Sequence, residues 1–371
     1  MPPPQGGETV APTQTSTPST PKPDPTPILV MPPSAYPALG PQKTIVLFAN
    51  YKDSAAKGDV LPTPDYSMIA GTIEQVDSHV REGSYGQTWL SGVVNPSKPA
   101  DVAGVFTLSA ESTQCGYYSY SEAINLASAA GVNIKAYDRI MLITPPDACP
   151  SQGAESGVGK MSLFAGGTFF QAGVLHVSGL GHFNLVVIAH EFGHSLGLLH
   201  STSMAGGSPE YDRSSYDYGD NFDIMGLYWS GMHFNAFQKE HLGWWGTQSG
   251  SRAWMSEISA NGTYVLEAYA SQSAGLKAIK IFRKNLPGRG NAYFYVQYHA
   301  PIGWDGTTSK PGILLHHGYP TSYDGGTWIP MADNDGLMVT GSTFTDVPSG
   351  ITIAVISING ATATVKVSGL P

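Results

Sequence analysis

Charged side chains are scarce in this sequence. Lysine, arginine, aspartate and glutamate together make up 13% of its 371 residues, against about 25% in an ordinary soluble domain. We expect glycine, serine and threonine to take the surface positions instead, which suits an exported protein better than a cytosolic one. The formal net charge is −9. A nucleic-acid partner is not expected, because a basic face is needed to bind phosphates.

Long apolar runs are absent as well. No run approaches the roughly 18–20 residues that a membrane-spanning helix needs, so no membrane span is predicted. The first four residues, MPPP, show neither the basic region nor the apolar region of a secretion signal. The expected location, secreted or extracellular, is therefore inferred from composition and not read from a signal.

Only two cysteines occur, Cys115 and Cys149. In an exported chain an even pair indicates one disulfide bond. Closing a loop of this length would stabilise the fold by about 4 kcal/mol in the chain-entropy model. Two free, buried thiols are the alternative, because the compartment itself is inferred.

Proline, by contrast, is concentrated at one end of the chain. Residues 1–41 hold 13 of the 28 prolines and little that could form a core. Such low-complexity Pro/Thr sequence is typical of a disordered, extended tether.

Strand patterns alternate with helical patterns between residues 42 and 248. Residues 45–49 form a short apolar run typical of a buried strand. Residues 67–82 carry apolar side chains three and four positions apart and stop at Gly83, which predicts a helix. The alternation predicts an α/β (α+β) domain with a twisted mixed sheet. Further strands are expected at 89–94, 105–108, 139–143, 160–165 and 168–171, and helices at 122–130, from about 183, and at 234–242.

The pattern changes near residue 249 to short strands separated by polar turns. Their regular spacing predicts a β-sandwich domain over residues 249–371. His316 and His317 lie on one of these strands, and we expect one ring to be exposed and no second metal site there. The sequence DNDG at 333–336 begins like a calcium loop but lacks the distal glutamate, so a turn is favoured.

The stretch 190–200, HEFGHSLGLLH, carries the chemistry. His190 and His194 are four residues apart, so on a helix they lie on one face and can share a metal ion. Gly197 can take the positive φ that ends a helix and lets His200 return as a third ligand. Glu191 lies beside the ligands and could act on water without coordinating. The predicted cofactor is one catalytic Zn²⁺ whose fourth position stays open.

Histidines on an apolar helix are more often core residues than metal ligands. However, HExxH followed by glycine and histidine at these spacings arises by chance in roughly 3 in 100,000 chains of this composition. A zinc site is therefore the favoured interpretation. The pattern is identified as the metzincin metallopeptidase signature.

A more specific resemblance follows downstream of His200. The stretch 218–226, YGDNFDIMG, with FNA at 234–236 and LGW at 242–244, resembles the gametolysin family of metzincin peptidases. The similarity covers about residues 43–371 and is most specific over 184–244. It implies a secreted zinc endopeptidase with His190, His194 and His200 as ligands and Glu191 as catalytic base. Algal members act on hydroxyproline-rich cell-wall glycoproteins, but no residue here indicates that substrate.

The same resemblance places Met225, 25 residues past His200, on a tight turn under the metal. Tyr228 could add a hydrogen-bond donor, but the tyrosine of other metzincins lies closer to its methionine, so this role is not favoured. Ca²⁺ is a further candidate cofactor at Asp217, Asp220 and Asp223, although local turn bonding is favoured for such short loops.

We therefore predict a zinc-dependent endopeptidase that acts on protein or peptide substrates. A substrate strand is expected to add to a sheet edge, with 163–167 as the candidate edge. One rival is a surface-binding or adhesive protein with a non-catalytic zinc site. The open fourth position and Glu191 argue against it, because structural zinc sites are closed by four ligands. The other rival is a zinc hydrolase that acts on a non-peptide bond.

Overall fold

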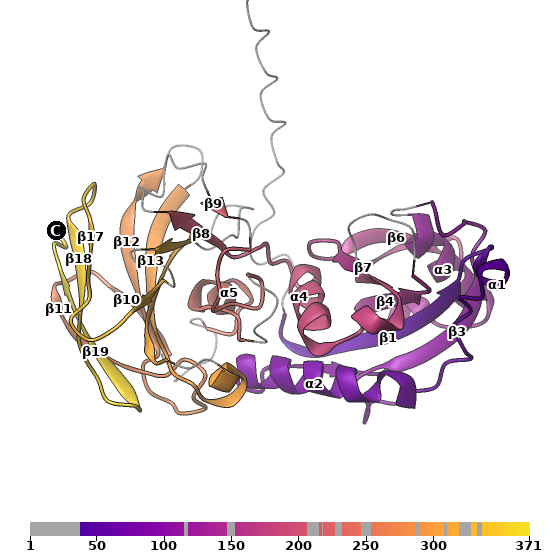
Figure 1. Cartoon of the computed structure of the whole chain (residues 1–371), viewed down its shortest axis with the longest axis horizontal. Helices are drawn as coiled ribbons and strands as arrows, with labels where there is room; N and C mark the ends of the chain where they lie inside the picture. The colour runs from indigo at the N-terminus through magenta and orange to yellow at the C-terminus, as the bar shows by residue number, and fades with distance from the viewer. Residues whose placement is uncertain are drawn as a thin grey trace, which may run out of the picture.

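The computed structural model describes most of the chain in two halves that lie side by side (Figure 1). The described residues are 38–114, 118–146, 153–205, 215–216, 218–226, 232–245, 254–286, 290–307, 310–318, 328–331 and 336–371. Several sequence-based predictions lie outside these residues: the tether up to residue 37, the Cys115–Cys149 disulfide, Asp217, Tyr228 and residues 333–335.

The first half is built on a curled, mixed sheet of seven strands. Their bounds are β1 Gly40–Asn50, β2 Thr88–Ser91, β3 Asp101–Thr107, β4 Arg139–Thr144, β5 Ala154–Ser156, β6 Met161–Ala165 and β7 Thr168–Ser178. The order β2-β1-β4-β7 is parallel, whereas β5 and β6 pair antiparallel with β7. The predicted mixed sheet is thus confirmed. Its antiparallel strands β5 and β6 pair with β7, the last strand before the HExxH helix.

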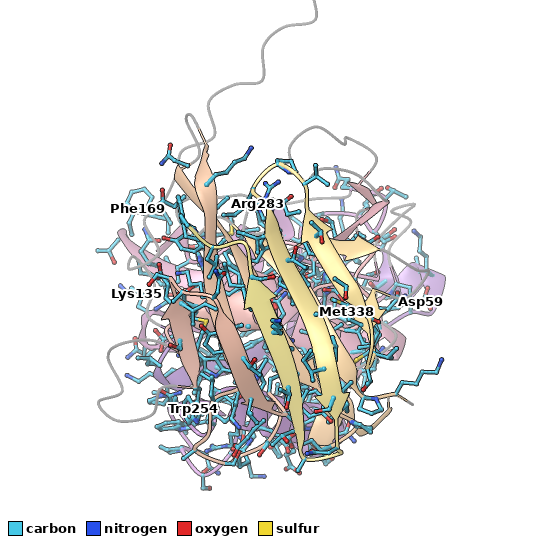
Figure 2. The ribbon with its side chains drawn as sticks, turned by 90° about the vertical axis from the view of Figure 1, so that its left-hand side faces the viewer. Asp59, Lys135, Phe169, Trp254, Arg283 and Met338 are labelled. Atoms are coloured by element: carbon cyan, nitrogen blue, oxygen red, sulfur yellow. The ribbon has the colours of Figure 1, made fainter. Side chains whose placement is uncertain are left out.

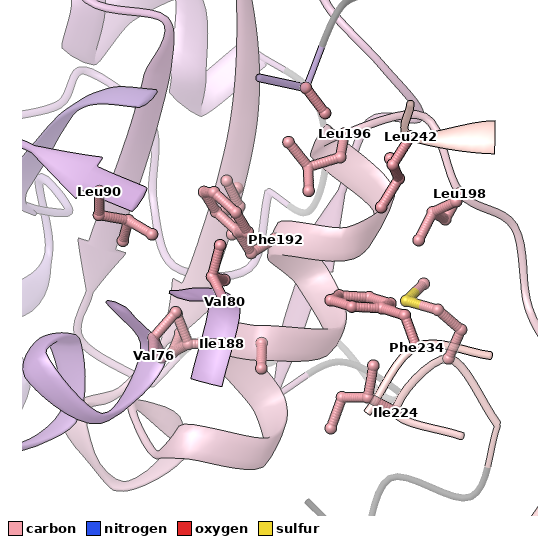
Figure 3. Close-up of a cluster of buried hydrophobic side chains, with 14 of the residues drawn as sticks. Val76, Val80, Leu90, Ile188, Phe192, Leu196, Leu198, Ile224, Phe234 and Leu242 are labelled. Atoms are coloured by element: carbon pink, nitrogen blue, oxygen red, sulfur yellow. The ribbon is translucent and has the colours of Figure 1, made fainter. Parts of the chain in front are cut away.

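Helices cover both faces of this sheet. They are α1 Ser54–Lys57, α2 Ser67–Gly83, α3 Tyr118–Ala129 and α4 Leu185–Ser195, with short 3₁₀ turns η2 Ile134–Ala136 and η3 Leu180–His182. Side chains of β1 alternate between two cores: Val46 and Phe48 pack with α2 and α4, whereas Ile45 and Leu47 pack with α3. Figure 3 shows the first of these cores, where side chains of α2 and α4 meet.

The second half consists of largely antiparallel sheets, as the change of periodicity near residue 249 predicts. The larger sheet contains β10 Met255–Ile258, β12 Ala278–Leu286, β13 Gly290–His299, β14 Gly312–Gly318, β15 Trp328–Met331 and β16 Leu337–Met338. The four-stranded sheet contains β11 Gly262–Glu267, β17 Thr343–Asp346, β18 Ile351–Ile358 and β19 Thr362–Ser368, and it faces the viewer in Figure 2. Apolar side chains of both sheets form one buried core.

Two strands that precede residue 248 are part of a sheet of the second half. β8 Thr202–Ala205 and β9 Ser215–Tyr216 follow the HExxH helix, yet both belong to the larger sheet of the second half, where β8 pairs in parallel with β15. This pairing joins residues on the two sides of the predicted division at residue 248. β8 begins two residues after His200, so the metal-binding segment is followed at once by a strand of the second half's sheet.

Helix α5, Ala236–His241, lies between the halves (Figure 1). It begins with a capping box formed by Asn235 and Gln238. Its Glu240 carboxylate accepts hydrogen bonds from Lys280 Nζ at 2.8 Å and Tyr295 Oη at 2.6 Å. Because these partners belong to β12 and β13, α5 is fixed to the second half. Among the described helices, none has the length and apolar character needed to cross a membrane.

One expectation for the second half is wrong. The sequence predicted an exposed ring in the pair His316–His317, but both side chains on β14 are fully buried. His316 Nε2 lies 2.9 Å from Asp220 Oδ2, and the ring of His317 packs 5.5 Å from that of Phe294. Both faces of β14 are therefore covered, one by the loop after the HExxH helix and one by the sheet core.

His79 of α2 is fully buried at the interface between the halves. Its Nε2 donates to the carbonyl oxygen of Met232 at 2.9 Å, and its ring stacks 5.2 Å from that of His233. Burial, with His233 adding to the effect, lowers the pKa of His79 to about 3. The side chain is therefore neutral in the folded protein, whereas in the unfolded chain it takes up a proton near its ordinary pKa of about 6.5.

We expect this difference to destabilise the protein in acid. Because the folded pKa is the lower one, the unfolded state binds the extra proton as the pH falls from about 6.5 towards 3, and stability is lost over that range. For His79 alone the loss between pH 7 and pH 5 is about 2 kcal/mol. Urea unfolding at the two pH values, for the wild type and His79→Gln, measures it. An identical pH dependence in both proteins would contradict a neutral, buried His79.

Candidate metal centre

Helix α4 carries the first two histidines. It starts at Leu185, where the side chain of Asn184 accepts a hydrogen bond from the backbone N–H of Val187. One turn apart on its buried surface, His190 and His194 have ring centroids separated by 4.7 Å. The predicted placement of both rings on one helix face is confirmed.

The chain then turns back at Gly197. This residue has φ 105°, in the region that glycine adopts readily, and the helix ends at Ser195. The reversal brings His200 Nε2 to 3.1 Å from His194 Nε2. One ligand atom from each of His190, His194 and His200 lies within 4.8 Å of the others. The sequence therefore predicted correctly both the break and the convergence of the three side chains.

Two backbone carbonyls orient the imidazoles. His190 Nδ1 donates to the oxygen of Ile224 at 2.7 Å, and His194 Nδ1 donates to the oxygen of Leu198 at 2.8 Å. With the proton held on Nδ1, each ring turns the lone pair of Nε2 towards the shared centre. Burial is the main cause that lowers the pKa of His194 to about 4, so this ring is neutral, as a ligand must be.

This donor set fits a zinc ion. Two Zn–N bonds of about 2.0–2.1 Å that meet at a tetrahedral angle hold their nitrogens about 3.3 Å apart, close to the 3.1 Å between His194 and His200. Neutral imidazoles are also a ligand type that zinc prefers. The three histidines are the one group of three or more metal-ligating side chains within the part of the chain that the structure describes.

Glu191 lies next to the ligands, in the buried part of α4. Its side chain is buried, and burial raises its pKa to about 8, with the carboxylate of Glu155 on β5 adding to the rise. It does not belong to the group of three converging ligands. A carboxyl group with a pKa near neutrality can take up and release a proton under ordinary conditions.

Met225 lies directly beneath the helix, in contact with it at Gly193. A Cβ built on Gly193 would overlap the Sδ of Met225 and lie 2.9 Å from the ring of Phe234. Position 193 therefore has to be glycine, because only a residue without a side chain lets the methionine reach the helix between His190 and His194. The sequence analysis predicted the place of Met225 but gave Gly193 no role. The need for glycine at position 193 becomes visible only once the turn packs against the helix.

We expect Gly193→Ala to weaken the centre and the fold together. Overpacking of this kind costs about 1–3 kcal/mol, of which better helix propensity returns about 1 kcal/mol. Zinc affinity should fall as well, because the displaced turn also supplies the carbonyl of Ile224 to His190. Gly71→Ala in α2 is the matched control, since a Cβ there meets nothing within 4 Å. Urea unfolding and zinc competition titrations measure both effects. Equal behaviour of the two variants would contradict the close contact.

Tyr218, which the sequence analysis used only as part of the resemblance over residues 218–226, lies beside the metal centre. The ring centroid of Tyr218 lies 3.8 Å from that of His200 and 5.7 Å from that of His190. Tyr218 has φ 61°, a backbone conformation that is uncommon for a residue with a side chain. Strained conformations of this kind occur most often at functional sites.

The nearby aspartates form hydrogen bonds within the loop, as expected for the turn alternative to calcium. Asp220 Oδ1 accepts from the N–H of Phe222 at 2.8 Å, and Asp223 Oδ1 accepts from the N–H of Met225 at 2.7 Å. Asp223 Oδ2 also accepts from Nδ2 of Asn235 at 2.5 Å. Together with the bond between His316 Nε2 and Asp220 Oδ2, these bonds engage both carboxylates in holding the turn under α4.

No protein-family model matches this sequence, and none of the curated proteins compared with it matches.

Proposed function

We propose that this protein is a secreted, zinc-dependent endopeptidase of the metzincin type, similar to the gametolysin family. The observation that carries the proposal is the convergence of His190, His194 and His200 with the buried Glu191 beside them. The Gly197 turn and the position of Met225 under the helix add to it. In this interpretation the first half is a metzincin catalytic domain and the second half a β-sandwich.

The three histidines would hold the ion through their Nε2 atoms. Bound zinc would supply Lewis-acid chemistry, lowering the pKa of water towards about 7 and polarising a carbonyl oxygen. The carboxylate of Glu191 accepts the proton of the attacking water and delivers it to the nitrogen of the departing amine.

The peptide substrate binds along the free edge of the first sheet. β5 and β6 pair with β7 on one side only, within the strands that the structure describes. Between them, the N–H of Gly159 donates to the carbonyl oxygen of His194 at 2.8 Å, so the edge lies against the metal-binding helix. The predicted segment 163–167 is the far part of this edge. Backbone pairing there gives affinity with little demand on sequence.

The alternative is a surface-binding or adhesive protein with a non-catalytic zinc site. Structural zinc sites are closed by four protein ligands, and within the described residues no fourth side chain joins the three histidines. This observation favours the enzyme over the alternative.

The test is digestion of denatured casein by the purified full-length protein, with and without a chelator. We expect cleavage that the chelator abolishes and that added zinc restores. Protein that contains zinc but cleaves no unfolded substrate would refute the peptidase and favour the binding protein. Cleavage that survives complete removal of metal would refute the zinc mechanism.

A further inference from the structure

The loop 220–226 carries the acceptor that orients the first metal ligand. The oxygen of Ile224, bonded to His190 Nδ1, lies within this loop, which is compact and buried. The N–H of Gly226 donates to the oxygen of Asp223 at 2.9 Å, and the N–H of Ser201 donates to the oxygen of Met225 at 2.9 Å. The direction of the His190 ring thus depends on where this loop is held.

One of the side chains that hold the loop comes from the second half. His316 of β14 places Nε2 at 2.9 Å from Oδ2 of Asp220, and both side chains are fully buried. The other oxygen of Asp220 binds the N–H of Phe222 inside the loop. Asp220 therefore links β14 to the loop, and the loop links to His190.

We propose that His316 is a positioning residue of the metal centre, acting through Asp220 and the Ile224 carbonyl on the orientation of His190. The proposal rests on the metal centre inferred above. Its physical basis is the cost of leaving one oxygen of a buried carboxylate without its donor, which forces the group to take up a proton or the loop to move. Either change alters the position of the Ile224 oxygen. The second half thereby helps to hold the metal ligand His190 in its orientation.

His317, the next residue along β14, provides the matched control. It is buried to the same extent but points to the opposite face of the strand, where its ring packs near Phe294. A loss of stability from disturbing β14 in general should follow substitution of either histidine. A change in the metal centre should follow only substitution of His316.

The experiment compares four full-length proteins: wild type, His316→Leu, His316→Gln and His317→Leu. Zinc affinity is measured by chelator competition, and the ligand geometry by the visible absorption of the cobalt(II)-loaded proteins. Loss of an outer partner of a metal ligand weakens binding about 10–100-fold. Because His316 acts through Asp220, we expect His316→Leu to lose about tenfold and to shift the cobalt spectrum. Glutamine can donate from a similar position, so His316→Gln should restore much of both. His317→Leu should leave both unchanged.

The outcomes separate the two proposals. Wild-type protein that takes up neither metal overturns the metal centre and the role of His316 together. Wild type that binds zinc, with His316→Leu equal to it in affinity and spectrum, overturns the role of His316 alone. If circular dichroism shows that His316→Leu does not fold, Asp220→Asn takes its place, since it keeps the side-chain size while removing the charge and one acceptor oxygen. Unchanged metal binding in Asp220→Asn would equally overturn the proposal.

Discussion

Replacing Glu191 with glutamine should abolish peptidase activity and leave zinc in place. General-base assistance contributes about 10²–10⁴-fold to the rate, and an amide cannot accept the proton. Zinc content should stay near one per chain because His190, His194 and His200 are untouched. The fold should tolerate the change, since glutamine has nearly the same size as glutamate and brings no charge into the buried site. Metal analysis and a quenched-peptide assay on the same samples provide the measurement.

Two further variants make this result specific. His194→Ala should lose metal and activity together, because two histidines hold zinc poorly. Glu257→Gln, at an exposed position on β10, should change neither. Activity that persists in Glu191→Gln would refute the proposed proton transfer while leaving the zinc centre standing.

A fragment that ends at residue 248 should lose both cooperative folding and zinc binding. Such a fragment lacks β15, the partner of β8, and leaves the buried Asp220 without His316. It also removes Gln297, whose Oε1 accepts from the N–H of Ala236 at 2.6 Å. Leaving one buried polar group without its hydrogen-bond partner costs about 1–3 kcal/mol, and a domain has only about 5–15 kcal/mol of stability in total. Urea unfolding and zinc titration of the fragment and the full chain measure the loss.

The matched control is a chain shortened at the other end. The described fold begins at Ala38, so removing residues 1–37 should preserve the unfolding transition and the zinc stoichiometry. A fragment 38–248 that unfolds cooperatively and binds one zinc ion would contradict the dependence of the metal centre on the second half.

The local structure of this protein could be predicted from the sequence alone. The four-residue spacing of His190 and His194 determines their common helix face, because helix geometry is a property of the backbone. Gly197 could be identified as the break, because positive φ favours glycine. The alternation of helical and strand patterns likewise indicated a mixed sheet followed by antiparallel sheets, since burial of one face imposes a period on the sequence.

Contacts between distant segments were decided only by the tertiary structure. Gly193 looks like a tolerated helix glycine until Met225 is packed against it, and His316 looks like a strand residue until Asp220 lies opposite it. The close contact between the rings of Tyr218 and His200 is of the same kind. In each case the two partners lie far apart in the sequence. The local sequence pattern of either partner does not predict which buried surface the other will meet, because that depends on how distant segments of the chain pack together.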